Sequence, residues 1–162
     1  MMDMKYSRIK KLIFSIFICL FAGFIGSFFT SPAIPTWYAT LQKPSFTPPN
    51  WIFFPVWTSL FIMMGISLFL VWQKGREDQK VKTALYVFAV QLVLNALWSA
   101  AFFGLRSPLA GLLEIIILWI LILATILSFM KISRTAAYLL IPYILWVSFA
   151  AILNFSIWRL NS

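Results

Sequence analysis

The sequence predicts an all-α membrane protein, a bundle of five transmembrane helices with a long first loop rich in proline and aromatic residues. The first observation is composition: 62% of the 162 residues are hydrophobic and only 10% are charged. A soluble domain carries about 25% charged residues, which cover its surface. The second observation is that mean hydropathy is +0.94. The third is that the apolar residues gather in five runs close to the roughly 20 residues that cross a bilayer. The whole chain therefore reads as one membrane domain.

The five runs are continuously apolar, whereas strands of a membrane barrel alternate between apolar and polar residues. Backbone groups in lipid must be hydrogen-bonded within their own segment, so helices are expected. The predicted spans are residues 12–29, 52–72, 84–105, 109–130 and 136–158. Cys19 lies in the first run and is expected to pack as a small hydrophobic residue. Glu114 is the one carboxylate or amine inside the runs. It is either a proton or cation site or a side chain that bends to the headgroups or bonds a neighbouring helix.

Basic residues predict the orientation. The N-terminal tail and the loops at 73–83 and 131–135 share one side of the membrane and hold ten Lys and Arg, against three on the other side. The ten are Lys5, Arg8, Lys10, Lys11, Lys74, Arg76, Lys80, Lys82, Lys131 and Arg134, and the three are Lys43, Arg106 and Arg159. The positive-inside rule places the N-terminus in the cytoplasm and the C-terminus outside the cell membrane. The charges flank helix ends and form no separate basic domain. We therefore expect the lipid bilayer, and no nucleic acid, as their partner.

The first connection, residues 30–51, differs from the short loops that follow it. It holds five of the eight prolines, which lack an N–H and exclude a long helix. The stretch from Thr36 to Gln42 has room for one or two helical turns. A stiff, aromatic loop of this length predicts a lid over a binding site. The alternative is an interfacial anchor, because Trp and Tyr favour the headgroup zone.

Two helices carry a polar and aromatic stripe at helical spacing. The members are Gln91, Asn95, Trp98 and Phe102 on the third helix, and Tyr143, Trp146, Ala150 and Asn154 on the fifth. We expect the two stripes to face each other inside the bundle. They form either a ligand cavity oriented by Gln91 and Asn95 or hydrogen bonds that only tie helices together. Small residues at Ala96, Ala100 and Gly104 suit close helix contact, within one chain or in a homodimer.

Reactive groups are scarce. The chain has no His, one Cys, two Asp and two Glu, which excludes a His-based triad, a His-ligated metal and a His-ligated haem. We expect no metal site and no required cofactor. Eight Trp, 17 Phe and 5 Tyr favour the binding of flat apolar ligands instead.

Three segments carry a resemblance to a known family. They are WYATLQKPSFTPPNWIFFPVWTSLF (37–61), NALWSAAFFG (95–104) and PYILWVSFAAILNFSIWR (142–159). With these segments and five spans, the sequence resembles the TspO/MBR family of translocator proteins and tryptophan-rich sensory proteins over nearly its whole length. The resemblance implies a five-helix bundle, often dimeric, with a ligand pocket beneath the first loop.

The resemblance also implies a ligand. Family members bind porphyrins such as protoporphyrin IX and haem, and eukaryotic members bind cholesterol. The pocket residues implied for this chain are Tyr38, Trp51, Asn95, Trp98, Phe102, Trp146 and Ala150. Phe155 stands where the cholesterol motif needs Tyr, which weakens a sterol reading. We therefore expect a membrane receptor or sensor that binds tetrapyrroles and regulates their handling. The alternatives are light- and oxygen-dependent degradation of protoporphyrin IX, for which Trp51 and Trp146 would be the catalytic pair, and translocation of porphyrin or sterol.

Overall fold

The computed structural model describes residues 2–75 and 77–162. The helices are α1 (Met2–Ala33), α2 (Trp37–Thr40), α3 (Asn50–Trp72), α4 (Gln79–Ser99), α5 (Pro108–Met130), α6 (Arg134–Leu139) and α7 (Ile141–Leu160). A π-helical turn, η1 (Ala100–Gly104), extends α4. Among the described residues, five segments are long and apolar enough to cross a membrane. The predicted all-α fold with five spans is confirmed.

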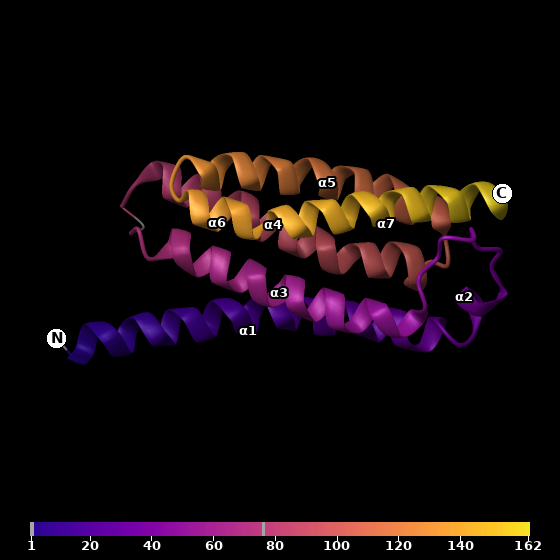
Figure 1. Ribbon diagram of the computed structural model, residues 1–162, viewed down its shortest axis with the longest axis horizontal. Helices are drawn as coiled ribbons and strands as arrows, with labels where there is room; N and C mark the ends of the chain where they lie inside the picture. Colours follow the sequence, from indigo (N-terminus) through magenta and orange to yellow (C-terminus); the bar gives the residue numbers. More distant parts are fainter. Residues whose placement is uncertain (1, 76) are drawn as a thin grey trace.

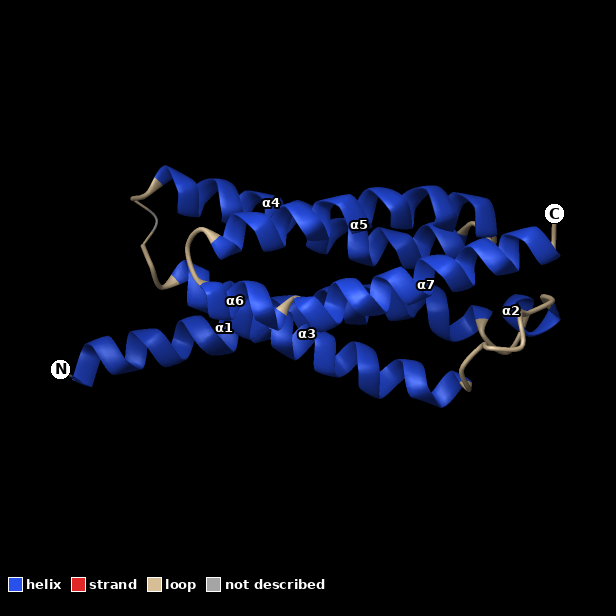
Figure 2. Cartoon of the chain, turned by 45° about the horizontal axis from the view of Figure 1, so that its top comes forward, coloured by secondary structure: helices blue, strands red, loops and turns tan. Residues whose placement is uncertain are grey.

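The helices run up and down along one long axis (Figures 1 and 2). The chain termini lie at opposite ends (Figure 1). α1 packs against α3 and α4, while α5 packs against α4 and α7. We call the end with α2 and the C-terminus the loop end, and the end with the N-terminus and the connection between α3 and α4 the basic end. Of the residues counted for orientation, Arg76 and the side chain of Lys5 lie outside the described part.

Helix boundaries differ from the predicted spans where capping groups act. α4 begins at Gln79, five residues ahead of the predicted start, because the Asp78 carboxylate accepts a hydrogen bond of 2.8 Å from the backbone N–H of Lys80. Ser107 caps α5 in the same way, accepting from the N–H of Ala110 at 3.2 Å. The predicted fifth span is divided at Leu140 into α6 and α7, with Pro142 in the first turn of α7.

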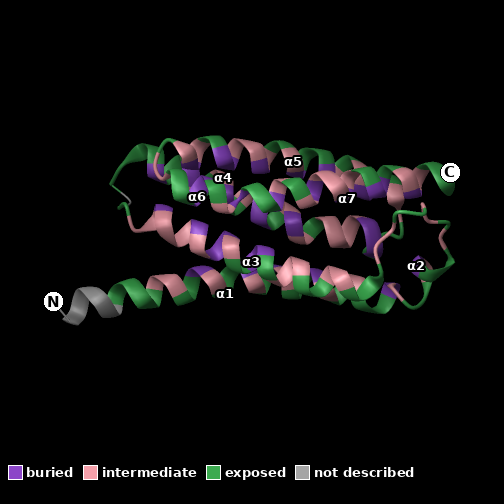
Figure 3. Cartoon of the chain, viewed as in Figure 1, coloured by how far each residue is buried: buried purple, intermediate pink, exposed green. Residues whose placement is uncertain are grey.

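Buried residues lie on the inward faces of the helices (Figure 3). Many exposed residues are large and hydrophobic. Met64, Ile122 and Phe129 are fully buried, and so is Cys19, as predicted. A second, smaller cluster at the loop end joins Tyr38 to residues of η1 and α7. On α1, exposed phenylalanines such as Phe17 and Phe28 face outward. In water such a surface would aggregate, whereas in a bilayer it contacts acyl chains.

Candidate ligand-binding cavity

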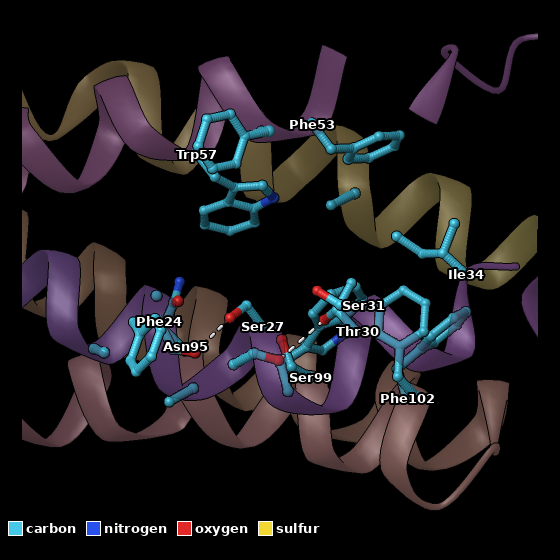
Figure 4. A pocket seen from close by; sticks show the side chains of 18 of the residues that line it. Phe24, Ser27, Thr30, Ser31, Ile34, Phe53, Trp57, Asn95, Ser99 and Phe102 are labelled. Carbon is cyan, nitrogen blue, oxygen red and sulfur yellow. Dashed lines mark hydrogen bonds between the residues drawn. The ribbon is translucent and has the colours of Figure 1, made fainter. Parts of the chain in front are cut away.

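A cavity of about 480 Å³ lies in the loop-end half of the bundle. Its walls come from α1, α3, α4 with η1, and α7, and Tyr38 of α2 closes the end. This volume falls within the range of about 300–1,000 Å³ typical of small-molecule sites. Figure 4 shows Trp57 and Phe53 of α3 on one side of the space and Asn95, Ser99 and Phe102 on the other.

Five of the seven pocket residues implied by the resemblance line this cavity: Tyr38, Asn95, Trp98, Phe102 and Ala150. Trp51 and Trp146 are placed elsewhere. The Trp51 side chain is 72% exposed at the start of α3. The Trp146 ring lies behind a lining residue, with its centroid 5.8 Å from that of Phe53. The structure thus gathers five of these residues at one site, and ligand binding by all seven stays a prediction.

A buried polar chain connects the two stripes. Asn95 Nδ2 donates to the Tyr143 hydroxyl at 2.8 Å, and that hydroxyl donates to Gln91 Oε1 at 2.9 Å. α4 and α7 therefore face each other as expected. The chain ties helices together, and Asn95 also lines the cavity. The two interpretations of the stripes are compatible.

A second polar chain lies nearer the loop end. Trp98 Nε1 donates to Asn154 Oδ1 at 3.3 Å, and Asn154 Nδ2 donates to the carbonyl of Pro108 at 2.7 Å. An indole N–H needs a partner when water is excluded, and so does the side-chain amide of Asn154. Asn154 accepts from the indole, donates to the Pro108 carbonyl, and so holds the Trp98 ring in the cavity wall.

The π-helical turn shapes the wall beside Trp98. Its hydrogen bonds run over five residues, from the N–H of Leu105 to the carbonyl of Ala100 at 2.8 Å and from Ser107 to Phe102 at 3.1 Å. A π-helical turn holds more residues than an α-helical turn, so consecutive side chains are separated by a smaller angle around the helix axis. Such turns are frequent at functional sites. Phe102 and the adjacent Phe103 are both buried, with centroids 4.8 Å apart. Nothing in the sequence AAFFG signalled this turn.

α1 forms a wall of the cavity that the sequence did not predict. Gly23, Ser27, Thr30 and Ile34 line the cavity at spacings of four, three and four residues, which is one helical face. The Ser27 and Thr30 hydroxyls donate to backbone carbonyls of their own helix, at 2.6 and 3.1 Å. Such bonding lets hydroxyl residues sit in an apolar wall. The small and hydroxyl residues at helical spacing in this part of the sequence could have predicted a face of α1 turned toward the cavity.

The first loop covers the end of the cavity. The short helix α2 confirms the predicted helical turn, and it buries Tyr38 against Phe102 and Phe103, with ring centroids 6.2 and 5.7 Å away. Burial raises the pKa of the Tyr38 hydroxyl above its usual value near 10. Lys43 Nζ lies 4.6 Å from the Tyr38 ring centroid.

The loop is tied, just after α2, to the C-terminal end of α7. Asn161 Oδ1 accepts from the N–H of Gln42 at 3.0 Å, and Asn161 Nδ2 donates to the carbonyl of Gln42 at 2.9 Å. One side chain thus pairs both backbone groups of a loop residue. This geometry agrees with the lid interpretation of the loop.

Two other predicted features are Glu114 on α5 and the small residues on α4 and η1. Both carboxylate oxygens of Glu114 are buried without a hydrogen-bond partner among the described atoms. Of the small residues on α4 and η1, Ala96 lines the cavity and Gly104 lies beside α1, where an added methyl group would sit 3.0 Å from the Phe29 ring. These small residues thus serve close packing within one chain. A homodimer stays a prediction.

Comparisons with known proteins show the family of this chain. Residues 15–159 match the model of the TspO/MBR family. The chain is 51% identical to the tryptophan-rich protein TspO of Chlorobaculum tepidum, over 95% of this chain and 98% of that protein. It is 49% identical to the tryptophan-rich protein TspO of Archaeoglobus fulgidus, over 96% and 99%, and 38% identical to the human translocator protein, over 85% and 82%. This integral membrane protein belongs to the TspO/MBR family.

Proposed function

We propose that this protein is a membrane receptor or sensor that binds tetrapyrroles, with metal-free protoporphyrin IX as the model ligand, in the loop-end cavity. The observation that carries the proposal is a site of about 480 Å³ with aromatic rings on both sides. A porphyrin is a flat apolar disc, and ring contacts contribute about 0.5–1.5 kcal/mol per pair beyond burial. The names of relatives, a tryptophan-rich sensory protein and a translocator protein, agree with a receptor of this general kind.

Charge constrains how such a ligand lies. Among the described residues, no charged side chain lines the cavity. Carboxylates are costly in an apolar wall, so the propionates of a porphyrin belong at the loop end. Lys43 is half-buried there, and Arg106 is exposed in the turn between η1 and α5. Either cation offers a charge-assisted hydrogen bond to a propionate at the loop end.

The test is a dark titration of the purified protein with protoporphyrin IX, read by the shift of the porphyrin Soret band. We expect saturable binding that weakens in Trp98→Phe and Trp57→Phe, because both rings line the cavity. Trp158→Phe is the matched control, since this ring packs on Phe155 away from the cavity. Absence of saturable binding would refute the proposal.

Illumination of the same sample in air separates the alternatives. Loss of the Soret band with a new product, dependent on Trp51 and Trp146, would indicate porphyrin degradation. Flux of porphyrin between the two sides of sealed vesicles would indicate translocation. A stable Soret band without porphyrin flux would support the receptor function over both alternatives.

A further inference from the structure

The cavity reaches the lipid-facing surface of the bundle. Phe24 of α1 and Phe54 of α3 both line it, yet their side chains are 56% and 79% exposed. A side chain that lines a cavity and also lies on the outer surface marks a place where the wall is incomplete. The wall is therefore open between the loop-end halves of α1 and α3. We call this opening the α1–α3 gap.

Contacts between α1 and α3 explain where the gap begins. Farther toward the basic end the helices are in close contact at glycines. A methyl group added at Gly65 would lie 2.5 Å from the Cα of Ile16, and one at Gly23 would overlap the Phe61 ring. Closer to the loop end, Thr58 lines the cavity and its hydroxyl donates to the carbonyl of Phe54 within α3, at 2.8 Å. This hydroxyl is satisfied within its own helix, as is that of Ser27 across the gap, so parting the helices here breaks neither bond.

The gap lies between two segments that are long and apolar enough to cross a membrane, Ser7–Ala33 and Asn50–Trp72. Phe24 stands nine residues before the end of α1, and Phe54 stands four residues after the start of α3. At 1.5 Å per residue, these positions are about 14 Å and 6 Å below the helix ends. The opening therefore faces acyl chains.

The route through the loop is held closed at several points. Tyr38 is buried under the loop, and Asn161 pairs both backbone groups of Gln42. Beyond Gln42, the Phe46 ring packs on Phe149 with centroids 6.3 Å apart. Opening the loop breaks these contacts together. Opening the gap requires that two exposed phenylalanine side chains change rotamer, which is fast, and Phe24 then gives up only ring contacts with Phe21 and Phe28 of its own helix.

We propose that the cavity exchanges its ligand with the bilayer through the α1–α3 gap, with Phe24 and Phe54 as the gate, while the first loop stays closed. The ligand class is a flat apolar molecule dissolved in the membrane. This inference rests on the proposed function, since it names the route into the same cavity.

The experiment uses the full-length protein in lipid vesicles, with protoporphyrin IX supplied in the bilayer and binding followed by stopped-flow absorbance. We expect association to accelerate in Phe24→Ala and Phe54→Ala, by about tenfold in the double variant, which is within the range that access mutations span. Phe17→Ala is the matched control, because Phe17 is equally a lipid-facing phenylalanine of α1 but does not line the cavity. Asn161→Ala tests the loop route. Phe24→Leu and Phe54→Leu provide milder gate variants if the alanine variants fail to fold.

The outcomes separate the route from the function. Faster association in Asn161→Ala, with none in the gate variants, would overturn the lateral route. Faster dissociation alone in the gate variants would make Phe24 and Phe54 ordinary contacts and would also overturn it. In both cases equilibrium binding persists and the proposed function survives. Absence of saturable binding in the unaltered protein would overturn the function as well.

Discussion

Removal of the Tyr143 hydroxyl tests the buried chain that joins α4 to α7. The side chain is 1% exposed, and its hydroxyl accepts from Asn95 and donates to Gln91. Hydrogen bonds between membrane helices contribute about 0.6–2 kcal/mol each. We expect Tyr143→Phe to lose two of them and to lower the free energy of unfolding by about 1–4 kcal/mol.

The assay is unfolding in mixed micelles by added SDS, followed by tryptophan fluorescence. Tyr86→Phe is the matched control, because Tyr86 is on the same helix as Asn95 and is 72% exposed. We also expect Tyr143→Phe to weaken protoporphyrin binding, since Asn95 loses the partner that orients its side chain in the cavity wall. An unfolding free energy within about 0.5 kcal/mol of the Tyr86→Phe value would refute the reasoning, because surface substitutions stay within that range.

Three further predictions concern packing, pH and topology. Gly65→Ala should lower the free energy of unfolding by about 1–3 kcal/mol, because the new methyl group meets the helix backbone at Ile16. Gly104→Ala should lower it less, because its methyl group meets the Phe29 ring, which can move. Unfolding in SDS compares the two variants. Burial favours the protonated hydroxyl of Tyr38, so the stabilisation that Tyr38 gives to the docked loop is complete below pH 10 and is lost as pH rises through the elevated pKa. Proteolysis of the loop should therefore increase at that pH in the unaltered protein and should not change with pH in Tyr38→Phe. A cysteine at Ser162 should react with an impermeant maleimide added outside intact cells, while labelling only after lysis would reverse the orientation predicted from the basic residues.

The features that sequence reasoning found are those with a strong periodic or compositional signal. The five spans follow from apolar runs, and the short helix in the first loop follows from a proline-free stretch between prolines. The facing stripes on α4 and α7 follow from helical spacing, because Asn95 and Tyr143 each need a buried partner in lipid.

The features that it missed depend on tertiary packing. The π-helical turn at Ala100–Gly104 leaves no local mark in an apolar run. The division of the fifth span at Leu140 has one in Pro142, which lies in the first turn of α7, but a proline alone does not fix where the helix divides. The rotation of each helix about its own axis also leaves no mark in the local sequence. Trp146 shares a helical stripe with Ala150, yet only Ala150 lines the cavity, while Trp146 faces the back of Phe53. A lipid-facing side chain and a cavity-facing one are equally apolar, so hydropathy does not distinguish them.

The position of Trp51 connects the family resemblance to the gap. Trp51, Phe54 and Thr58 are at spacings of three and four residues and share one face of α3. Phe54 and Thr58 line the cavity beside the gap, and Trp51 lies one turn closer to the start of α3 with its side chain 72% exposed. A small ligand that fits wholly inside the cavity has no reason to touch this ring. A tetrapyrrole that extends into the gap reaches it. The exposure of Trp51 is therefore consistent with a role in binding a large ligand, and that role depends on the same opening between α1 and α3.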